Sequence, residues 1–176
     1  MAKLRISGCV NDSIVDGPGL RFTLFTQGCP HNCPGCHNPQ THDFKGGYNA
    51  SIKKIFAQIK ANPLLSGVTF SGGEPFVQAK TLVPLAKMIK EAGLELACYT
   101  GFVFEQLASD QVKGARELLN YIDVLIDGKF VLSQRSLDLA FKGSKNQRTI
   151  NVSQSLKEGK VVLEKSERWT KNPKKN

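Results

Sequence analysis

Short apolar segments alternate with amphipathic ones along most of this chain, and this alternation constrains the fold more than any other feature. Four segments are rich in branched or aromatic residues and end at a glycine or a turn, which is typical of β-strands. They are residues 21–27, 68–71, 94–100 and 122–126. Helical patterns lie between them. This order predicts parallel strands joined by right-handed crossovers, in an open doubly wound sheet or in part of a (βα) barrel.

The helical segments have clear limits. The first is expected to begin after Ser51, a residue type that caps helices, and to stop at Asn62-Pro63. Its apolar residues share one face at helical spacing: Ile52, Ile55, Phe56 and Ile59. A second helix should end at Gly93, and residues 103–119 should hold one broken helix or two short ones.

The length of the chain limits how far a barrel can close. A complete (βα)8 barrel takes about 250 residues, whereas this chain has 176. With 40% apolar and 22% charged residues, one globular domain is expected. No long apolar run or signal-peptide core is visible, which predicts a cytoplasmic protein without a membrane segment.

A net charge of +9 raises the question of an acidic partner. Residues 158–176 are rich in lysine, and Lys171, Lys174 and Lys175 surround Pro173. We therefore expect a folded domain over residues 1–155 and a basic, solvated tail over residues 156–176. Docking of this tail on a partner is the alternative. Nucleic acid is not an expected partner, because aromatic residues do not interleave with the basic ones.

The least ordinary residues come directly after the expected strands. They are Cys29, Cys33 and Cys36, then Gly72 to Glu74, then Thr100-Gly101, then Asp127 to Lys129. In parallel α/β folds, the carboxyl ends of the strands form the functional site. The four loops should therefore converge on one mouth.

Three of the five cysteines lie in the loop GCPHNCPGCHNPQ, residues 28–40, at the spacing C-x3-C-x2-C. Thiolates at this density select zinc, copper(I) or iron–sulfur clusters. A structural zinc site needs a fourth ligand, which His31, His37 or His42 could supply. In a [4Fe–4S] cluster, three cysteines leave one iron free to bind a small molecule. The cysteines alone leave zinc, a cluster and redox-active thiols open.

The cysteine loop together with Gly72-Gly73-Glu74-Pro75 resembles the radical S-adenosylmethionine enzymes. The resemblance implies a [4Fe–4S] cluster on Cys29, Cys33 and Cys36, which are then the catalytic and metal-binding residues. It implies that S-adenosylmethionine chelates the open iron and that Gly72-Gly73-Glu74 receives its amino group. Glycine permits this close approach, and a carboxylate suits an ammonium. The implied fold is a partial (βα) barrel of about five to six parallel strands.

Further segments resemble a narrower family, the activating proteins of anaerobic ribonucleoside-triphosphate reductases. They are Asp16-Gly17-Pro18-Gly19, Cys36-His37-Asn38, Tyr99-Thr100-Gly101, IDVLIDGKF at 122–130 and GSKNQR at 143–148. The resemblance implies reductive cleavage of S-adenosylmethionine to methionine and a 5′-deoxyadenosyl radical, which takes a hydrogen atom from a glycine Cα. The implied partners are the reductase as protein substrate and a flavodoxin as electron donor.

The same resemblance gives the residues expected around the cofactor. They are Gly35, Cys36, His37, Gly72, Gly73, Glu74, Asp127 and Lys129. Gly35 replaces an aromatic residue common in radical enzymes, and Lys142 stands where arginine is expected. For Asp127, Lys129 and Asp16, a structural role in a turn is an equal alternative.

Three other functions stay open. Two are enzymes of the same chemistry, a pyruvate formate-lyase type activase and a radical enzyme acting on a small molecule. The GSKNQR stretch argues against the first, and the small open fold argues against the second. The third is a basic zinc-binding module for nucleic acid. Cys98 is expected in the core, Cys9 as incidental, and His31 and His42 as ordinary loop residues.

Overall fold

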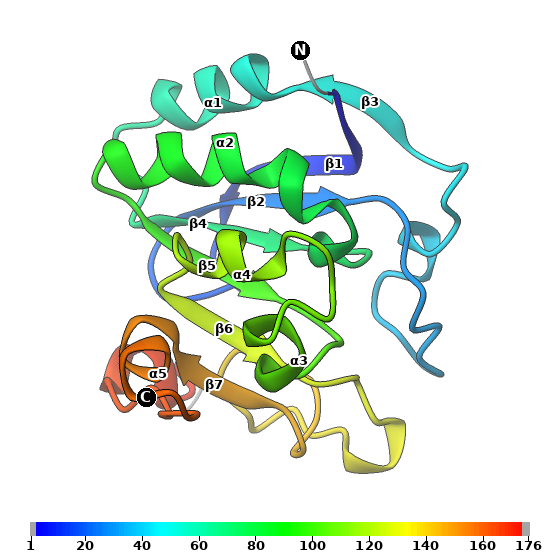
Figure 1. Ribbon diagram of the computed structural model, residues 1–176, viewed down its shortest axis with the longest axis vertical. Helices are drawn as coiled ribbons and strands as arrows, with labels where there is room; N and C mark the ends of the chain where they lie inside the picture. The colour runs from blue at the N-terminus through cyan, green and yellow to red at the C-terminus, as the bar shows by residue number, and fades with distance from the viewer. Residues whose placement is uncertain (1–2, 174–176) are drawn as a thin grey trace.

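The computed structural model describes residues 3–173, which form one mixed sheet of seven strands in the order β3-β1-β2-β4-β5-β6-β7 (Figure 1). The strands are β1 (Lys3–Ser13), β2 (Arg21–Thr26), β3 (Tyr48–Ser51), β4 (Gly67–Ser71), β5 (Glu95–Tyr99), β6 (Val124–Asp127) and β7 (Arg148–Asn151). The predicted α/β class is confirmed.

Four strands of the sheet, β2, β4, β5 and β6, run parallel to one another. The other three, β1, β3 and β7, run antiparallel to their neighbours. The expectation of five to six parallel strands is therefore wrong. Residues 14–20, which join β1 to β2, are too few for the crossover that a parallel pair requires. Residues 128–147 return the chain to β7 without a crossover helix.

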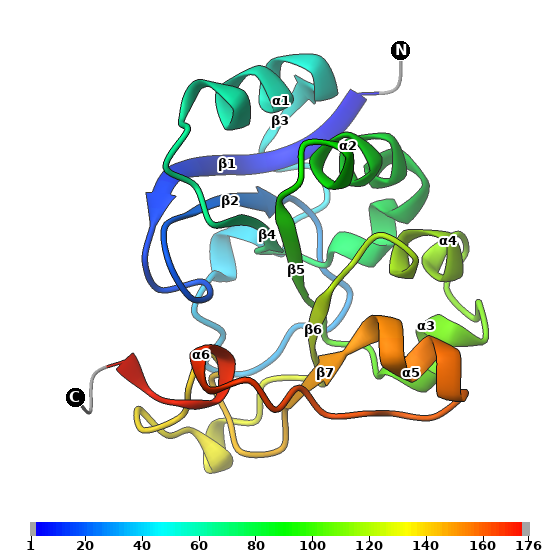
Figure 2. The same ribbon diagram turned by 90° about the vertical axis from the view of Figure 1, so that its left-hand side faces the viewer.

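The helices lie mainly on one face of the sheet. They are α1 (Ile52–Ala61), α2 (Ala79–Glu91), α3 (Phe104–Ala108), α4 (Ala115–Leu119), α5 (Val152–Glu158) and α6 (Glu167–Thr170). Figure 2 shows α2 to α5 on one side of the sheet, with α6 and several loops on the other. Ser51 precedes α1 as predicted. In the described range 3–173, none of the helices is both long and apolar enough to cross a bilayer.

Two apolar clusters cover the two faces of the sheet. The larger one lies between the strands and the helices and includes Leu24, Phe70 and Leu85, which are fully buried. The smaller one lies on the opposite face and joins Ala97, Val124 and Ile126 to Trp169 of α6. Short helix α6 thus packs on the face that the other helices leave uncovered.

Trp169 anchors the C-terminal segment. Only 1% of its surface is exposed, and its ring packs edge-on against Phe141 at a centroid distance of 5.5 Å. The guanidinium of Arg21 lies 5.4 Å from the ring centroid and pairs with Glu95, which also pairs with Arg168. Burial lowers the pKa of Arg21 to about 10, so it stays charged at neutral pH.

These contacts correct the expectation of a solvated tail. Trp169 is buried by contacts with the sheet, which composition does not reveal. The proposed boundary at residue 155 falls inside α5. Lys171 is exposed as expected, whereas Lys174 and Lys175 lie outside the described residues.

We expect Trp169→Ala to lower the free energy of unfolding by about 3–5 kcal/mol, because it empties a well-packed site. Denaturant unfolding of the metal-loaded protein under anaerobic conditions, followed by circular dichroism, measures this change. Trp169→Phe is the matched control and should cost clearly less, since a ring still faces Phe141. A loss below about 1 kcal/mol for Trp169→Ala would show that α6 is not anchored.

Candidate functional site

A cavity of about 700 Å³ lies at the carboxyl ends of the four parallel strands. The loops after these strands supply much of its wall: Cys29, Cys33 and Cys36 after β2, Gly72 and Gly73 after β4, Thr100 and Gly101 after β5, and Gly128 and Phe130 after β6. In Figure 1 these loops leave the sheet on the same side. The structure thus confirms that the four strand-end loops meet.

The cysteine loop is closed at its base by backbone hydrogen bonds. The N–H of Gly28 donates to the carbonyl of Thr41 at 2.8 Å, and the N–H of Cys29 donates to that of His42 at 3.1 Å. Inside the loop, the N–H of Asn38 donates to the Cys36 sulfur at 3.4 Å. This contact helps to hold the Cys36 sulfur at the cavity wall.

The glycine turn after β4 is bound to the base of the cysteine loop. The N–H of Gly73 donates to the hydroxyl of Thr41 at 2.7 Å, and the N–H of Glu74 donates to the carbonyl of Gly28 at 2.9 Å. Gly72 and Gly73 both have positive φ angles, 54° and 53°. A Cβ atom on Gly73 would lie 2.6 Å from the Thr26 carbonyl oxygen. Only glycine fits this close approach of two chain segments.

The carboxylate of Glu74 lies behind this turn and does not line the cavity. It is fully buried and accepts hydrogen bonds from the N–H of Phe76 (3.1 Å), the hydroxyl of Thr100 (2.8 Å), the N–H of Gly101 (2.8 Å) and Nε2 of His31 (2.7 Å). The carboxylate therefore joins the loops that follow β2, β4 and β5.

Gly35 and His37 flank the third cysteine. Gly35 has φ +74°, and a Cβ atom there would lie 2.8 Å from a methyl group of Leu132. The His37 ring lines the cavity and lies 5.2 Å from the Phe130 ring, centroid to centroid. The segment after the third cysteine thus packs against the loop after β6.

Comparison with known proteins identifies the family. Residues 15–150 match the family model described as a 4Fe-4S single cluster domain. The anaerobic ribonucleoside-triphosphate reductase-activating protein of Haemophilus influenzae is 34% identical over 142 residues, which cover 76% of this chain and 89% of the relative. This chain belongs to that family of activating proteins. The corresponding protein of Vibrio cholerae is 35% identical with the same coverage.

Two further proteins are similar over smaller parts of their length. The pyruvate formate-lyase-activating enzyme of Clostridium pasteurianum is 35% identical over 72% of this chain, but the match covers only 53% of that enzyme. The crystal structure of QueE from Escherichia coli matches 56% of this chain and 53% of its own, with a TM-score of 0.45 and 19% identity. The family assignment rests on the activating proteins.

The donor set of this activating-protein family member fits an iron–sulfur cluster. Cys29, Cys33 and Cys36 are free thiols on the wall of one cavity, and thiolates are the ligands that such clusters prefer. Within the described part of the chain, no three His, Cys, Asp or Glu side chains are grouped to hold one metal ion. Burial raises the pKa of the Cys29 thiol, so ligation must release its proton. The family match decides between zinc and a cluster in favour of the cluster.

Four predicted site residues do not line the cavity: Gly35 and Glu74, described above, and Asp127 and Lys129. Asp127 is 1% exposed and pairs with Arg148, whose Nη2 lies 2.5 Å from Oδ2. It also accepts the N–H of Phe104 at 2.8 Å. Hydrogen bonds to Asp127 and then Glu105 raise the pKa of Arg148. Lys129 is exposed, and neither Asp127 nor Lys129 lines the cavity.

The segment GSKNQR, residues 143–148, holds the loop after β6 in place. Gln147 donates to the carbonyl of Gly128 at 3.0 Å and accepts the N–H of Gly143 at 2.9 Å. Asn146 donates to the carbonyl of Lys129 at 2.8 Å. The geometry gives this segment a structural role in positioning Gly128 and Phe130 on the cavity wall.

Sequence reasoning missed or misread three site residues. His31 was expected to be an ordinary loop residue, which is wrong, because its side chain is 7% exposed and binds the buried Glu74. Thr41 binds Gly73, and its place beside the cysteine loop was its only sequence signal. Asp16 lines the cavity and accepts hydrogen bonds from the hydroxyls of Ser13 and Thr23 at 2.5 and 3.0 Å. These bonds favour the structural interpretation of Asp16.

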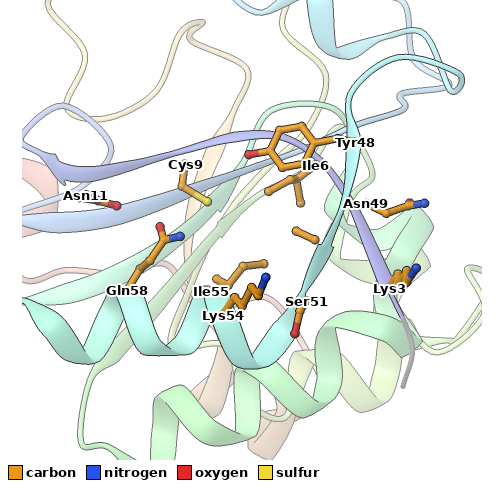
Figure 3. Close-up of a pocket in the computed structure, with 11 residues that line it drawn as sticks. Lys3, Ile6, Cys9, Asn11, Tyr48, Asn49, Ser51, Lys54, Ile55 and Gln58 are labelled. Atoms are coloured by element: carbon orange, nitrogen blue, oxygen red, sulfur yellow. The ribbon is translucent and has the colours of Figure 1, made fainter.

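A second cavity of about 550 Å³ lies between β1, β3 and α1 (Figure 3) and shares no lining residue with the first. It contains Cys9, which faces Ile55 and Gln58 of α1. Burial raises the pKa of Cys9 to about 11, so the thiol stays protonated at neutral pH. This supports the interpretation of Cys9 as a residue outside the cluster chemistry.

Proposed function

We propose that this protein activates an anaerobic ribonucleoside-triphosphate reductase by generating a glycyl radical on it. The observation that carries this proposal is the match to activating proteins over 89% of the length of one relative, combined with one cavity that contains the three cysteines and the glycine turn. When bound, the reduced [4Fe–4S] cluster supplies the electron that cleaves S-adenosylmethionine to methionine and a 5′-deoxyadenosyl radical, which takes a hydrogen atom from a glycine Cα of the reductase.

The proposed roles of the residues follow from their positions. Cys29, Cys33 and Cys36 would hold the cluster, and because they are three protein ligands rather than four, they would leave one position open for S-adenosylmethionine. Gly72 and Gly73 present backbone to the cofactor, because their positive φ angles and missing side chains open the wall at this point. His37 lines the wall beside the third cysteine, and Gly35, which is not part of the wall, lets the cysteine loop pack closely against Leu132.

Glu74, Asp127 and Lys129 are expected to act from outside the cavity. Glu74 supports the glycine turn, and Asp127 fixes the end of β6 through Arg148. The side chain of Lys129 is exposed, and its position directly after β6 favours a structural role in the turn that follows this strand. We propose that the sheet is a partial barrel of the radical S-adenosylmethionine type, reduced to four parallel strands. A flavodoxin as electron donor and a place in the cytoplasm remain predictions.

Electron paramagnetic resonance tests the choice of target. The cluster-loaded, reduced protein is mixed with S-adenosylmethionine and either the anaerobic reductase or a pyruvate formate-lyase. We expect the doublet of a glycyl radical on the reductase and none on the lyase, because the chain covers only 53% of the lyase activase it resembles. Cofactor cleavage without a doublet on the reductase would point to another substrate.

A further inference from the structure

The carboxylate of Glu74 has no acceptor capacity left for a ligand. A carboxylate offers about four lone-pair sites, and Glu74 accepts four hydrogen bonds at 2.7–3.1 Å. The residue is 0% exposed and is not part of the cavity wall. An ammonium group in the cavity would have to compete with donors that are already in place. The geometry therefore separates Glu74 from its neighbours Gly72 and Gly73, which do line the cavity.

His31 is the one donor to Glu74 that comes from inside the cysteine loop. Its side chain is 7% exposed, and Nε2 lies 2.7 Å from Oε2 of Glu74. An Nε2–H group at this distance donates to Oε2 of Glu74. The ring packs edge-on against Phe102 at a centroid distance of 4.6 Å. His31 also lines the cavity, two positions from Cys29 and from Cys33.

We propose that His31 and Glu74 are positioning residues, which hold the cysteine loop and the Gly72-Gly73 turn at a fixed separation. The base of the cysteine loop is bound to this turn through Gly28 and Thr41. Between Cys29 and Cys33, the side chain of His31 joins the cysteine loop to Glu74, which follows β4. The inference rests on the proposed function in one respect: the cofactor must contact both the cluster and the turn.

Loss of the histidine should loosen this arrangement without removing a cluster ligand. A buried carboxylate that loses a donor is costly to keep in place, so Glu74 and the turn should shift. Cofactor affinity should then fall while cluster content stays constant. A residue needed only for folding would reduce both together.

Gly101 offers an independent steric probe of the same contact. The three atoms nearest to a Cβ atom on Gly101 all belong to the His31 ring, and that Cβ would overlap the ring. Gly101→Ala should therefore push His31 away from Glu74. If the effect acts through His31, the same substitution should cost nothing further when position 31 is already alanine.

The experiment titrates S-adenosylmethionine into the anaerobically reconstituted, reduced protein and follows the change in the paramagnetic resonance spectrum of the cluster. The variants are His31→Ala, His31→Gln, Gly101→Ala and the double variant with alanine at both positions. Glutamine is the conservative replacement, because its amide N–H can donate to Glu74. Gln111→Ala, at an exposed position between α3 and α4, is the control. Iron content is measured for each sample.

We expect His31→Ala and Gly101→Ala to raise the dissociation constant of S-adenosylmethionine at least about tenfold, with wild-type iron content. His31→Gln should lie within about threefold of the wild type, and the double variant should match His31→Ala. Unchanged affinity in His31→Ala, or equal loss in His31→Gln and His31→Ala, would overturn the proposal. Loss of iron in both His31 variants would also overturn it, since the contact would then serve the cluster alone.

Failure of the proposed function has a different signature. The wild-type protein would then bind and cleave the cofactor but form no glycyl radical on the reductase. The positioning proposal would still be decided by the titrations, because they do not involve the reductase.

Discussion

Replacing any one of Cys29, Cys33 or Cys36 with alanine should abolish the release of methionine and 5′-deoxyadenosine from S-adenosylmethionine. Each thiol lies on the wall of the same cavity, and a [4Fe–4S] cluster with three protein ligands has none to spare. The measurement is anaerobic reconstitution, iron analysis and chromatographic quantification of both products after dithionite reduction. The wild type should carry about four irons per chain.

Cys98→Ala and Cys9→Ala are the matched controls for these three variants. Cys98 is fully buried in β5, and burial raises the pKa of its thiol well above the usual range. Cys9 lies in the second cavity, where its pKa is about 11. Both controls should keep their iron and their cleavage activity. Cleavage at the wild-type rate in any of the three loop variants would refute the ligand assignment.

Gly73→Ala should reduce cleavage of S-adenosylmethionine at least about a hundredfold, because displacement of a reacting group by about 1 Å has effects of this size. The added Cβ would lie 2.6 Å from the Thr26 carbonyl oxygen and 2.9 Å from that of Gly28. Both are backbone atoms, so the turn itself must move. The same product assay measures the change.

Gly93→Ala separates backbone strain from displacement of the turn. Gly93 lies just after the C-terminal end of α2 and has a φ angle of +77°. A Cβ atom on Gly93 would meet no other atom within 4 Å. This variant carries a similar penalty for a left-handed conformation but leaves the cavity intact, so its cleavage rate should stay near that of the wild type. Equal rates for Gly73→Ala and Gly93→Ala would show that the turn does not position the cofactor.

The sequence identifies the four central strands because each is a short run rich in branched or aromatic residues that ends at a glycine or a turn. Strand β6 (Val124–Asp127) is buried at every position, as is β4. The outer strands carry no such signal. Strand β3 has the sequence YNAS with no fully buried residue, and β1 is exposed or half-buried over much of its length. Their pairing depends on tertiary contacts, so composition could not reveal it.

At the functional site too, the sequence predicts only those features that do not depend on tertiary contacts. The spacing of the cysteines and the two glycines located the cavity, because chemistry requires those residue types there. The role of Glu74 could not be derived in this way, since the saturation of its carboxylate depends on Thr100, Gly101 and His31, which are distant from it in sequence. Trp169 likewise lies in a polar segment of the sequence. It is buried because it packs on the sheet residues Ala97, Val124 and Ile126, which are distant from it in sequence.

The central claim is that the hydrogen atom taken up by 5′-deoxyadenosine comes from a glycine of the reductase. Deuterium labelling of the reductase tests this claim most directly. The reductase is prepared with deuterium on the Cα of its glycines and incubated anaerobically with the reduced, cluster-loaded protein and S-adenosylmethionine. Mass spectrometry of the 5′-deoxyadenosine should show one added deuterium in step with growth of the glycyl radical doublet. Unlabelled 5′-deoxyadenosine accompanying a full doublet would contradict the account, because the hydrogen would then have come from elsewhere.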